Sequence, residues 1–436
     1  MKIINSITRR DFVQKTAIGA TAWAAAPAIN ALGANDKINV GFIGTGDRGN
    51  YNIGQFRHWP EVNIVAVCDV YEPNLERAKE SAGSNPKGYK DFRQLLENKE
   101  IQAVCITTPD HWHCLNFIYS CQAGKDVYID KPLSVTITEG RAMVNAARKF
   151  NIVSQVGSEQ HSAPHYIEAV KYIHSGALGA ISMVKCWNYD NQAPQGIGNP
   201  ADEDPPKGLD WDLWLGPAPK VPFNKNRFLF NYRWFWDYSG GFLADWGVHH
   251  MDIILWALKE RAPKTAMVQG GKFVLHDNRQ TPDTFQATWE IGKNTLVLFT
   301  HRMGNRRGEN GHGYGIEFYG TEGTLYIDRA GYEVFPETRD GKSRCEVSKG
   351  SGINGDTHEY PHIRNFLDCV KSRQRCVCDI EWGHRATSVP LIGNLSYFTK
   401  QKVEWDAEKE QVTNVAEANQ YLFKEYRAPW SYREWL

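Results

Sequence analysis

The sequence predicts an α/β protein of two domains. The first is built on a doubly wound parallel sheet, and the second is an α+β domain with a large, open, mostly antiparallel sheet. Short β-rich runs alternate with helical patterns up to about residue 157, and longer strand-like runs dominate after about residue 158. A chain of 436 residues is long enough for two sizeable cores, and 42% hydrophobic residues argue against extensive disorder.

In the first domain, residues 35–158, strand-like and helical patterns take turns along the chain. The β-rich runs cover residues 38–43, 62–67, 103–107, 127–129 and 153–156. Helical patterns lie between them at residues 74–81, 91–97, 113–123 and 137–150. This alternation is typical of a doubly wound parallel sheet.

The second domain, residues 159–436, begins with a helical pattern at residues 164–175. Longer strand-like runs follow at residues 182–189, 284–291, 295–301 and 314–318. An open antiparallel sheet with helices on one face is the expected result. Residues 193–222, rich in Pro, Gly and Asp, are expected to form a long loop, which is unusual in a compact domain unless it lines a site.

A glycine-rich turn follows the first predicted strand, and Asp69 ends the next apolar run twenty residues after the last glycine. The first glycine permits a tight turn, the second lets the backbone approach a pyrophosphate, and the third allows close packing of helix on strand. The helix N-terminus presents unpaired N–H groups to phosphates. We therefore expect a Rossmann dinucleotide-binding domain whose loop consists of Gly44, Thr45, Gly46, Asp47, Arg48 and Gly49.

The acid at the end of the second predicted strand indicates which dinucleotide is bound. The carboxylate of Asp69 is placed to accept hydrogen bonds from both ribose hydroxyls, which favours NAD over NADP. NADP stays open as the alternative, because Arg48 in the glycine loop could bind either a pyrophosphate or a 2′-phosphate.

The first 34 residues are expected to lie outside the fold. Arg9 and Arg10 precede an Ala-rich, mildly apolar stretch at residues 16–28, which offers Ala-x-Ala cleavage choices. This pattern resembles a twin-arginine export signal and predicts a periplasmic protein from which the signal is removed. The stretch is too short to predict a stable membrane anchor, and an ordinary basic N-terminus is the alternative.

The composition favours a small-molecule partner. The formal net charge is zero, so no basic field suggests nucleic acid or an anionic membrane surface. The nine cysteines form no CxxC pattern, their odd number does not suggest a full disulfide framework, and no HExxH pattern is present. No metal site is therefore expected.

Residues 107–113 directly follow a predicted strand of the first domain. Ligands of parallel sheets bind at the carboxyl ends of strands. Four residues are accordingly expected beside the nicotinamide ribose: Thr108, Pro109, His111 and His113. Alternatively, the two histidines only cap and pack the following helix.

Lys131 also ends a predicted strand, and Pro132 fixes the turn after it. This lysine could donate a hydrogen bond to a substrate hydroxyl, and burial would lower its pKa toward a useful range. It could also bind the cofactor, as its place at a strand end allows. Its alternative role is an ion pair with Asp130 or with a neighbouring helix.

Asp245 and His249 lie four residues apart in a predicted helix and would share one face. There the carboxylate could orient the imidazole and hold its tautomer. His250 is turned away by about 100° and is expected to be structural. For an isolated pair with this spacing, a solvated ion pair is the alternative.

The motifs together resemble the Gfo/Idh/MocA oxidoreductases, because the glycine loop, the strand-end acid and the three later segments occur in that family's order over nearly the entire mature chain. The resemblance implies a nicotinamide cofactor between a Rossmann domain and an α/β domain whose open sheet mediates oligomerisation, here as a dimer or tetramer. It implies catalytic roles for Lys131, Asp245 and His249. The family's Glu-Lys-Pro has become Asp130-Lys131-Pro132, and an arginine that many relatives carry is missing from residues 157–161.

The same resemblance implies an oxidoreductase that moves a hydride between a tightly held nicotinamide and a sugar, glycoside or cyclitol hydroxyl. In that mechanism His249 removes the hydroxyl proton, Lys131 stabilises the alkoxide and Asp245 aligns the base. Rings with interspersed polar groups suit a pyranose, although plain packing is the alternative for the rings. Substrate contacts are expected from Lys131, Trp187, Asn188, Tyr189, Tyr232, Arg233, Trp236, Asp245 and His249.

Two other functions stay open. A glycoside hydrolase or lyase of the same fold would oxidise the sugar transiently, eliminate the glycosidic bond and return NAD unchanged. A non-catalytic sensor would keep the dinucleotide pocket without turnover. The intact lysine, aspartate and histidine favour oxidation over both.

Overall fold

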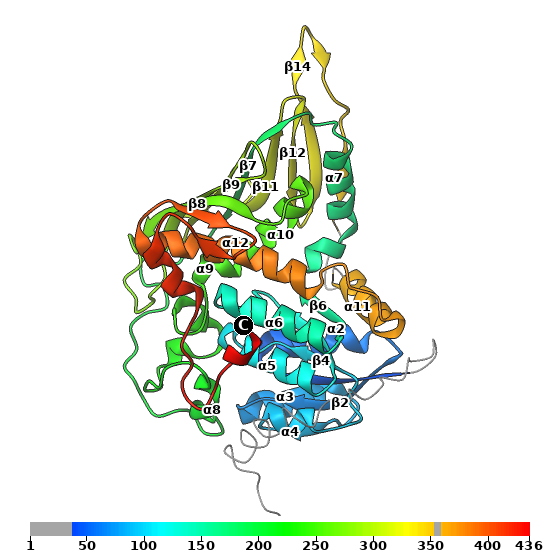
Figure 1. Cartoon of the computed structure of the whole chain (residues 1–436), viewed down its shortest axis with the longest axis vertical. Coiled ribbons are helices and arrows are strands. Elements are labelled where there is room, and N and C mark those ends of the chain that lie inside the picture. Colours follow the sequence, from blue (N-terminus) through cyan, green and yellow to red (C-terminus); the bar gives the residue numbers. More distant parts are fainter. Residues whose placement is uncertain (1–36, 353–358) are drawn as a thin grey trace, which may run out of the picture.

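The computed structural model describes residues 37–352 and 359–436. The predicted export signal, residues 1–34, lies outside the described residues. Two sheets dominate Figure 1, the Rossmann sheet below and a larger sheet above, and helix α12 (Ile380–Thr399) crosses between them. Within the described ranges, no helix has both the length and the apolar character that crossing a membrane requires.

The lower sheet has six parallel strands in the order β3-β2-β1-β4-β5-β6, which confirms the predicted Rossmann sheet. Its strands are β1 (Ile38–Ile43), β2 (Val62–Cys68), β3 (Lys87–Tyr89), β4 (Ala103–Ile106), β5 (Asp126–Asp130) and β6 (Ser154–Gly157). Strands β4, β5 and β6 are buried along their whole length. The helices are α2 (Asp47–Arg57), α3 (Glu72–Ala82), α4 (Phe92–Leu96), α5 (Asp110–Gln122) and α6 (Ile137–Lys149).

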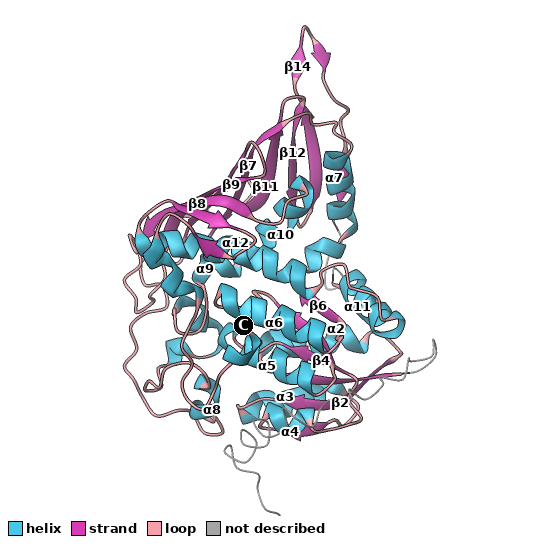
Figure 2. Cartoon of the chain, in the orientation of Figure 1, coloured by secondary structure: helices cyan, strands magenta, loops and turns pink. Residues whose placement is uncertain are grey.

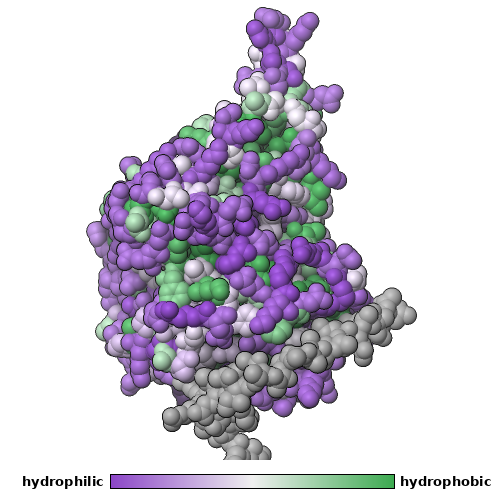
Figure 3. Space-filling model, in the orientation of Figure 1, coloured by the Kyte–Doolittle hydropathy of each residue, from purple (hydrophilic) through white to green (hydrophobic). Residues whose placement is uncertain are grey.

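The upper sheet has ten strands in its described part, in the order β16-β13-β12-β11-β7-β10-β9-β8-β17-β18. Its neighbours are antiparallel except for β7 and β10, as the predicted mostly antiparallel sheet requires. The strands are β7 (Ile181–Tyr189), β8 (Pro263–Gly271), β9 (Thr284–Ile291), β10 (Thr295–Arg302), β11 (Tyr314–Gly320), β12 (Gly323–Asp328), β13 (Gly331–Pro336), β16 (Lys349–Ser351), β17 (Val403–Asp406) and β18 (Gln411–Val412). A polar hairpin, β14 (Thr338–Arg339) with β15 (Lys342–Ser343), projects beyond it (Figures 2 and 3).

Helices cover one face of the large sheet and form its main core. The remaining described helices are η2 (Glu159–Ser162), α7 (Pro164–His174), α8 (Trp211–Leu215), η3 (Lys225–Arg227), η4 (Leu229–Trp234), α9 (Gly241–Asp245), α10 (Gly247–Leu258), α11 (Tyr360–Ser372), η6 (Ala416–Leu422) and η7 (Arg433–Trp435). Val184 and Cys186 of β7 belong to this core, together with Met251 of α10 and Val389 of α12. The opposite face carries a separate aromatic cluster of Trp187, Tyr189 and Tyr326.

The end of the chain returns to the Rossmann domain. Phe366 of α11 packs in one core with Val40 of β1 and Ile53 of α2. Trp430 and Trp435 pack in the core on the other side of the Rossmann sheet. Helix α12 contacts both α6 and α10, so it joins the two sheets' helical layers. The edge of the Rossmann sheet that carries the strand ends is thereby held against the second domain.

Candidate active site

The glycine loop has the shape that a pyrophosphate needs. Gly44 has a φ of +81°, and a Cβ there would lie 2.7 Å from the backbone N of Thr108. A Cβ on Gly49 would lie 2.1 Å from the carbonyl O of Gly44, so α2 packs directly on the loop. On Gly46 a Cβ would meet only Asn74, at 3.8 Å. The backbone at Gly46 is thus open to a ligand, as the predicted cofactor loop requires.

Asp69 follows β2 and is tied to the glycine loop. Its Oδ2 accepts a hydrogen bond from the backbone N–H of Thr45 at 2.8 Å, and its Oδ1 accepts one from the N–H of Tyr71 at 2.8 Å. Burial raises the pKa of this carboxyl, and those hydrogen bonds oppose the shift. Because Oδ1 keeps a free lone pair, Asp69 can still accept a hydrogen bond from a ribose hydroxyl. The loop and this acid fit NAD.

The charged side chains of the glycine loop form ion pairs with other side chains of the protein. Nε of Arg48 lies 2.7 Å from Oδ2 of Asp130, and its Nη1 lies 2.6 Å from Oε1 of Glu359. Asp47 is exposed and pairs with Arg77 at 2.9 Å. The guanidinium of Arg48 is committed to two carboxylates, which removes the ground for NADP that its position in the sequence offered.

The predicted long loop returns to the Rossmann domain beside Asp69. We call residues 208–210 the strap. Two backbone hydrogen bonds of 3.0 Å join it to Val70 and Glu72. An antiparallel bridge pairs it with Tyr71. The second domain is therefore fastened at the end of the site where the acid for the ribose lies.

The two histidines of the segment after β4 lie in the walls of the site. His113 is buried, with Nδ1 2.8 Å from the carbonyl O of Pro132 and Nε2 2.8 Å from that of Thr108. Nε2 of His111 lies 3.0 Å from a backbone carbonyl of α8. Burial lowers the pKa of His111 to about 3. Both rings thus bind backbone, while Thr108 and Pro109 form the turn into α5 at the expected sheet edge.

Lys131, Asp245 and Arg233 form an ionic group across the two domains. Nζ of Lys131 donates hydrogen bonds to Oδ1 of Asp245 at 2.8 Å and to its backbone O at 2.9 Å. Nε of Arg233 lies 3.3 Å from Oδ2 of the same carboxylate. Burial alone would raise the pKa of Asp245, but these two cations outweigh it and hold the pKa well below its usual range. Asp245 is therefore an ionised anchor for Lys131.

The expected hydrogen bond between Asp245 and His249 does not form. Helix α9 ends at Asp245 and α10 begins at Gly247, so Trp246 interrupts the continuous helix that the spacing assumed. His249 is buried, and its Nδ1 has no hydrogen-bond partner within the described chain. Burial and the nearby charge of Lys131 lower its pKa well below the usual value. The ring is consequently neutral at physiological pH.

Two of the predicted substrate residues lie on the wrong side of the large sheet. Trp187 and Tyr189 point to the face opposite the main core, where Nε1 of Trp187 donates to the carbonyl O of His312 at 2.7 Å. Asn188 points the other way, and its backbone O contacts Nδ1 of His301 at 2.7 Å. Strand alternation separates them, because successive side chains take opposite faces. Trp187 and Tyr189 are therefore not brought together with Lys131.

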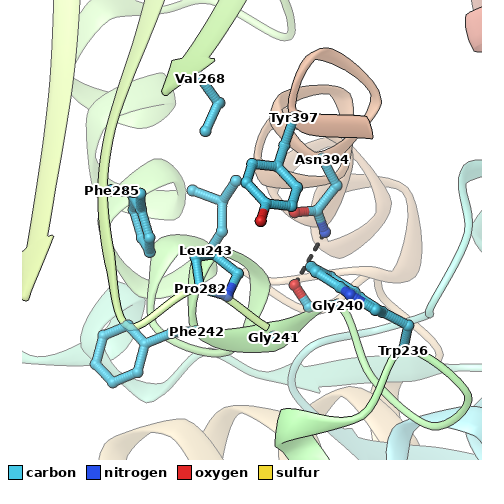
Figure 4. A pocket seen from close by; sticks show the side chains of 10 residues that line it. All are labelled: Trp236, Gly240, Gly241, Phe242, Leu243, Val268, Pro282, Phe285, Asn394 and Tyr397. Carbon is cyan, nitrogen blue, oxygen red and sulfur yellow. Dashed lines mark hydrogen bonds between the residues drawn. The ribbon is translucent and has the colours of Figure 1, made fainter. Parts of the chain in front are cut away.

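The residues of the segment after η3 are nearer to the ionic group. The hydroxyl of Tyr232 donates to Oδ1 of Asp110 at 2.9 Å. Trp236 instead lines a small, mostly apolar pocket beside α9 and α12 (Figure 4). None of its lining residues is Lys131, Asp245 or His249. This pocket lies apart from the predicted chemistry.

Buried charges at the same edge are not predicted by the sequence. Glu159 begins η2 directly after β6, and Arg329 approaches it at 3.9 Å. Glu359, which binds Arg48, comes from the segment before α11. Position after a parallel strand was the available signal for Glu159, as it was for Lys131. Nothing local in the sequence pointed to Glu359 or Arg329.

Two protein-family models match the chain. Residues 38–158 match the model of the oxidoreductase family with an NAD-binding Rossmann fold. Residues 163–290 and 347–432 match the model of that family's C-terminal alpha/beta domain. The N-terminal and C-terminal parts of the chain thus match the two domains of one family. The expected cofactor, NAD, is confirmed.

Curated relatives match over part of their length. Levoglucosan dehydrogenase of Pseudarthrobacter phenanthrenivorans is 31% identical over 170 residues, 36% of this chain and 44% of that protein. Glycosyl hydrolase family 109 protein 1 of Shewanella sp. strain MR-4 is 32% identical over 122 residues, 26% of this chain and 27% of that protein. Both matches therefore span less than half of the relative.

Solved structures match over most of the chain. Levoglucosan dehydrogenase in complex with NADH and levoglucosan has a TM-score of 0.67 at 18% identity, covering 85% of this chain and 99% of that one. GenD2 from gentamicin A biosynthesis, in complex with NAD, has a TM-score of 0.65 at 17% identity, covering 88% and 100%. These likenesses establish the fold. With both family models matched, the chain belongs to the Gfo/Idh/MocA family of NAD-binding oxidoreductases.

Proposed function

We propose that this protein oxidises a hydroxyl group of a sugar, glycoside or cyclitol with NAD. The observation that carries the proposal is the placement of Lys131 and a neutral, buried His249 around Asp245, at the strand ends that also carry the glycine loop. A neutral imidazole can accept the proton of a hydroxyl group, and an ammonium group can hold the alkoxide that remains.

His249 is suited to act as the base. Its low pKa keeps a lone pair available on the ring, so the ring can take the proton of a bound hydroxyl. Lys131 donates from a fixed position, because Asp245 holds its ammonium group at 2.8 Å. That ammonium group stabilises the negative charge that develops on the substrate oxygen. NAD, when bound, supplies the acceptor for the hydride of the same carbon.

A carbohydrate substrate is supported by the relatives. One is named levoglucosan dehydrogenase, and its solved structure is titled with NADH and levoglucosan. The similarity to a glycosyl hydrolase family 109 protein supports the second candidate, a hydrolase or lyase that oxidises transiently. The two candidate functions differ in their products, since the hydrolase or lyase leaves no net reduced nicotinamide.

We also propose that the cofactor is tightly held and that the protein works in the periplasm as a homo-oligomer. The strap supports tight retention, because it fastens the second domain beside Asp69. The twin-arginine pattern supports export. NAD copurifying with the folded protein and recovery of activity in a periplasmic extract are the expected results. Free exchange of NAD, or activity confined to the cytoplasm, would contradict them.

Replacement of His249 tests the proposed base. His249→Ala should lower turnover at least 100-fold, within the usual contribution of a general base, and leave NAD binding unchanged. His276→Ala is the matched control, because that histidine is exposed and lies in the loop after β8. Turnover of His249→Ala at the rate of the control would rule out His249 as the base.

A further inference from the structure

Glu159 is a buried carboxylate at the edge where the proposed reaction takes place. It begins η2 directly after β6, and only 5% of its surface is exposed. Its Oε2 has no hydrogen-bond partner within residues 37–352 and 359–436, and its Oε1 lies 3.9 Å from Nη2 of Arg329. A buried charge in this state is costly unless nearby opposite charge compensates it. Its retention therefore calls for a role.

Glu159 of η2 and His249 of α10 belong to two elements that pack against each other. Nδ1 of His161 lies 3.0 Å from Oδ1 of Asp252, and the His161 ring stacks on Trp256 with centroids 4.1 Å apart. His161 follows Glu159 by two residues, and Asp252 follows His249 by three. The contacts of His161 with Asp252 and Trp256 thus hold η2 against α10, close to Glu159 and His249.

Arg329 is a cation close enough to act electrostatically on both side chains. Its guanidinium carbon lies 5.3 Å from the ring centroid of Trp246, and that ring lies 5.7 Å from the ring of His249. Arg329 also approaches Glu159. One cation therefore neighbours both groups, and it keeps Glu159 ionised without occupying Oε2.

The ionised carboxylate of Glu159 and the protonated ring of His249 each favour the charged form of the other. Burial alone would raise the pKa of Glu159, but the charges of Arg48 and Arg329, and that of His249 when its ring is protonated, outweigh it and hold that pKa well below its usual range. Glu159 in turn favours the charged form of His249, whereas burial, Lys131 and Arg329 disfavour it. The facing charged groups come from several elements, namely Arg48, Asp130, Lys131, Asp245, Arg329 and Glu359.

We propose that Glu159 is the positioning residue whose carboxylate stabilises the imidazolium of His249 after that ring has taken the substrate's hydroxyl proton. The inference rests on the proposed function, in which His249 is the base. The proton moves from the substrate oxygen to a ring nitrogen, and Glu159 stays ionised with no bond made to it. A carboxylate near an imidazolium favours the charged form. Asp245 is already paired with Lys131 and Arg233, so stabilisation of the imidazolium falls to another carboxylate.

The test compares Glu159→Gln with Glu168→Gln, a matched control on the exposed face of α7. Two quantities are measured: the pKa of the His249 ring by NMR titration, and the pH dependence of kcat/KM. In Glu159→Gln the pKa of His249 should fall by about one unit, and kcat/KM at neutral pH should fall about tenfold. Glu159→Asp, which keeps the charge, should restore most of both, and the control should match the wild type.

The outcomes separate this inference from the proposed function. If Glu159→Gln leaves the pKa of His249 and the pH profile unchanged while His249→Ala abolishes turnover, Glu159 has no such role and the proposed base stands. If His249→Ala retains turnover, the proposed base is wrong. Should Glu159→Gln not fold, Glu159→Ala carries the test, because it also removes the charge, and the absence of any fall in the pKa of His249 contradicts the inference.

Discussion

Gly46→Ala separates ligand binding from folding at the glycine loop. Gly46 precedes α2 with a φ of −59° and a ψ of −161°, outside the left-handed region, and an added Cβ would meet only Asn74, at 3.8 Å. Alanine is a poorer residue than glycine at a helix start, which destabilises the fold, but it lowers the entropy of the unfolded chain, which stabilises the fold. These two effects oppose each other, so the free energy of unfolding should change by about 1 kcal/mol or less. The methyl group would instead occupy the space that the pyrophosphate needs.

We expect Gly46→Ala to weaken NAD binding at least tenfold, or about 1.4 kcal/mol, with a nearly unchanged Tm. Calorimetric titration gives the affinity, and thermal unfolding gives the Tm. Gly49→Ala should fold poorly, because its Cβ would lie 2.1 Å from the Gly44 carbonyl O and such overpacking costs about 1–3 kcal/mol or more. Gly54→Ala, with nothing within 4 Å, should gain about 1 kcal/mol and keep its affinity. Wild-type affinity in Gly46→Ala would refute the pyrophosphate position.

Two further predictions concern stability and substrate binding. Trp187→Phe should lose about 1 kcal/mol of stability with the hydrogen bond to His312, while KM stays unchanged; a large rise in KM would put the substrate on the outer face. Burial and the charge of Glu159 raise the pKa of the Glu359 carboxyl to about 7. The stability that this carboxyl contributes is therefore full below the pKa that it has in the unfolded chain. That contribution is lost as the pH rises through about 7. Glu359→Gln should remove this loss, which amounts to at most about 1.4 kcal/mol per pH unit in denaturation curves at pH 5 to 8; parallel curves for wild type and variant would disprove it.

The Rossmann domain was readable from sequence because its elements are locally specified. Apolar runs buried on both faces, such as residues 38–43, appear as continuous β-rich segments, and the glycines mark the turn after them. Strand β3 escaped prediction because its three residues, Lys87 to Tyr89, give no periodicity. Pro73 in the first turn of α3 fits a helix start two residues earlier than predicted.

The features that sequence could not give depend on distant partners. Alternation in β7 separates Trp187 and Tyr189 from Asn188, but it does not say which face the helices cover. The apolar stripe of α11 predicts burial, whereas its packing on β1 and α2 arises only in the folded chain. The spacing of Asp245 and His249 implied one helix, and a Cβ on Gly247 would lie 3.2 Å from Pro390, so α12 packs closely where the helix is interrupted.

Incubation of the purified protein and NAD with glucosides, galactosides and inositols, one at a time, tests the central claim most directly. Reduced nicotinamide is followed by absorbance and the products by mass spectrometry. We expect at least one compound to yield a keto product and reduced nicotinamide in equal amounts. Cleavage of a glycoside without net reduced nicotinamide, or no reaction with any compound while NAD is bound, would contradict it.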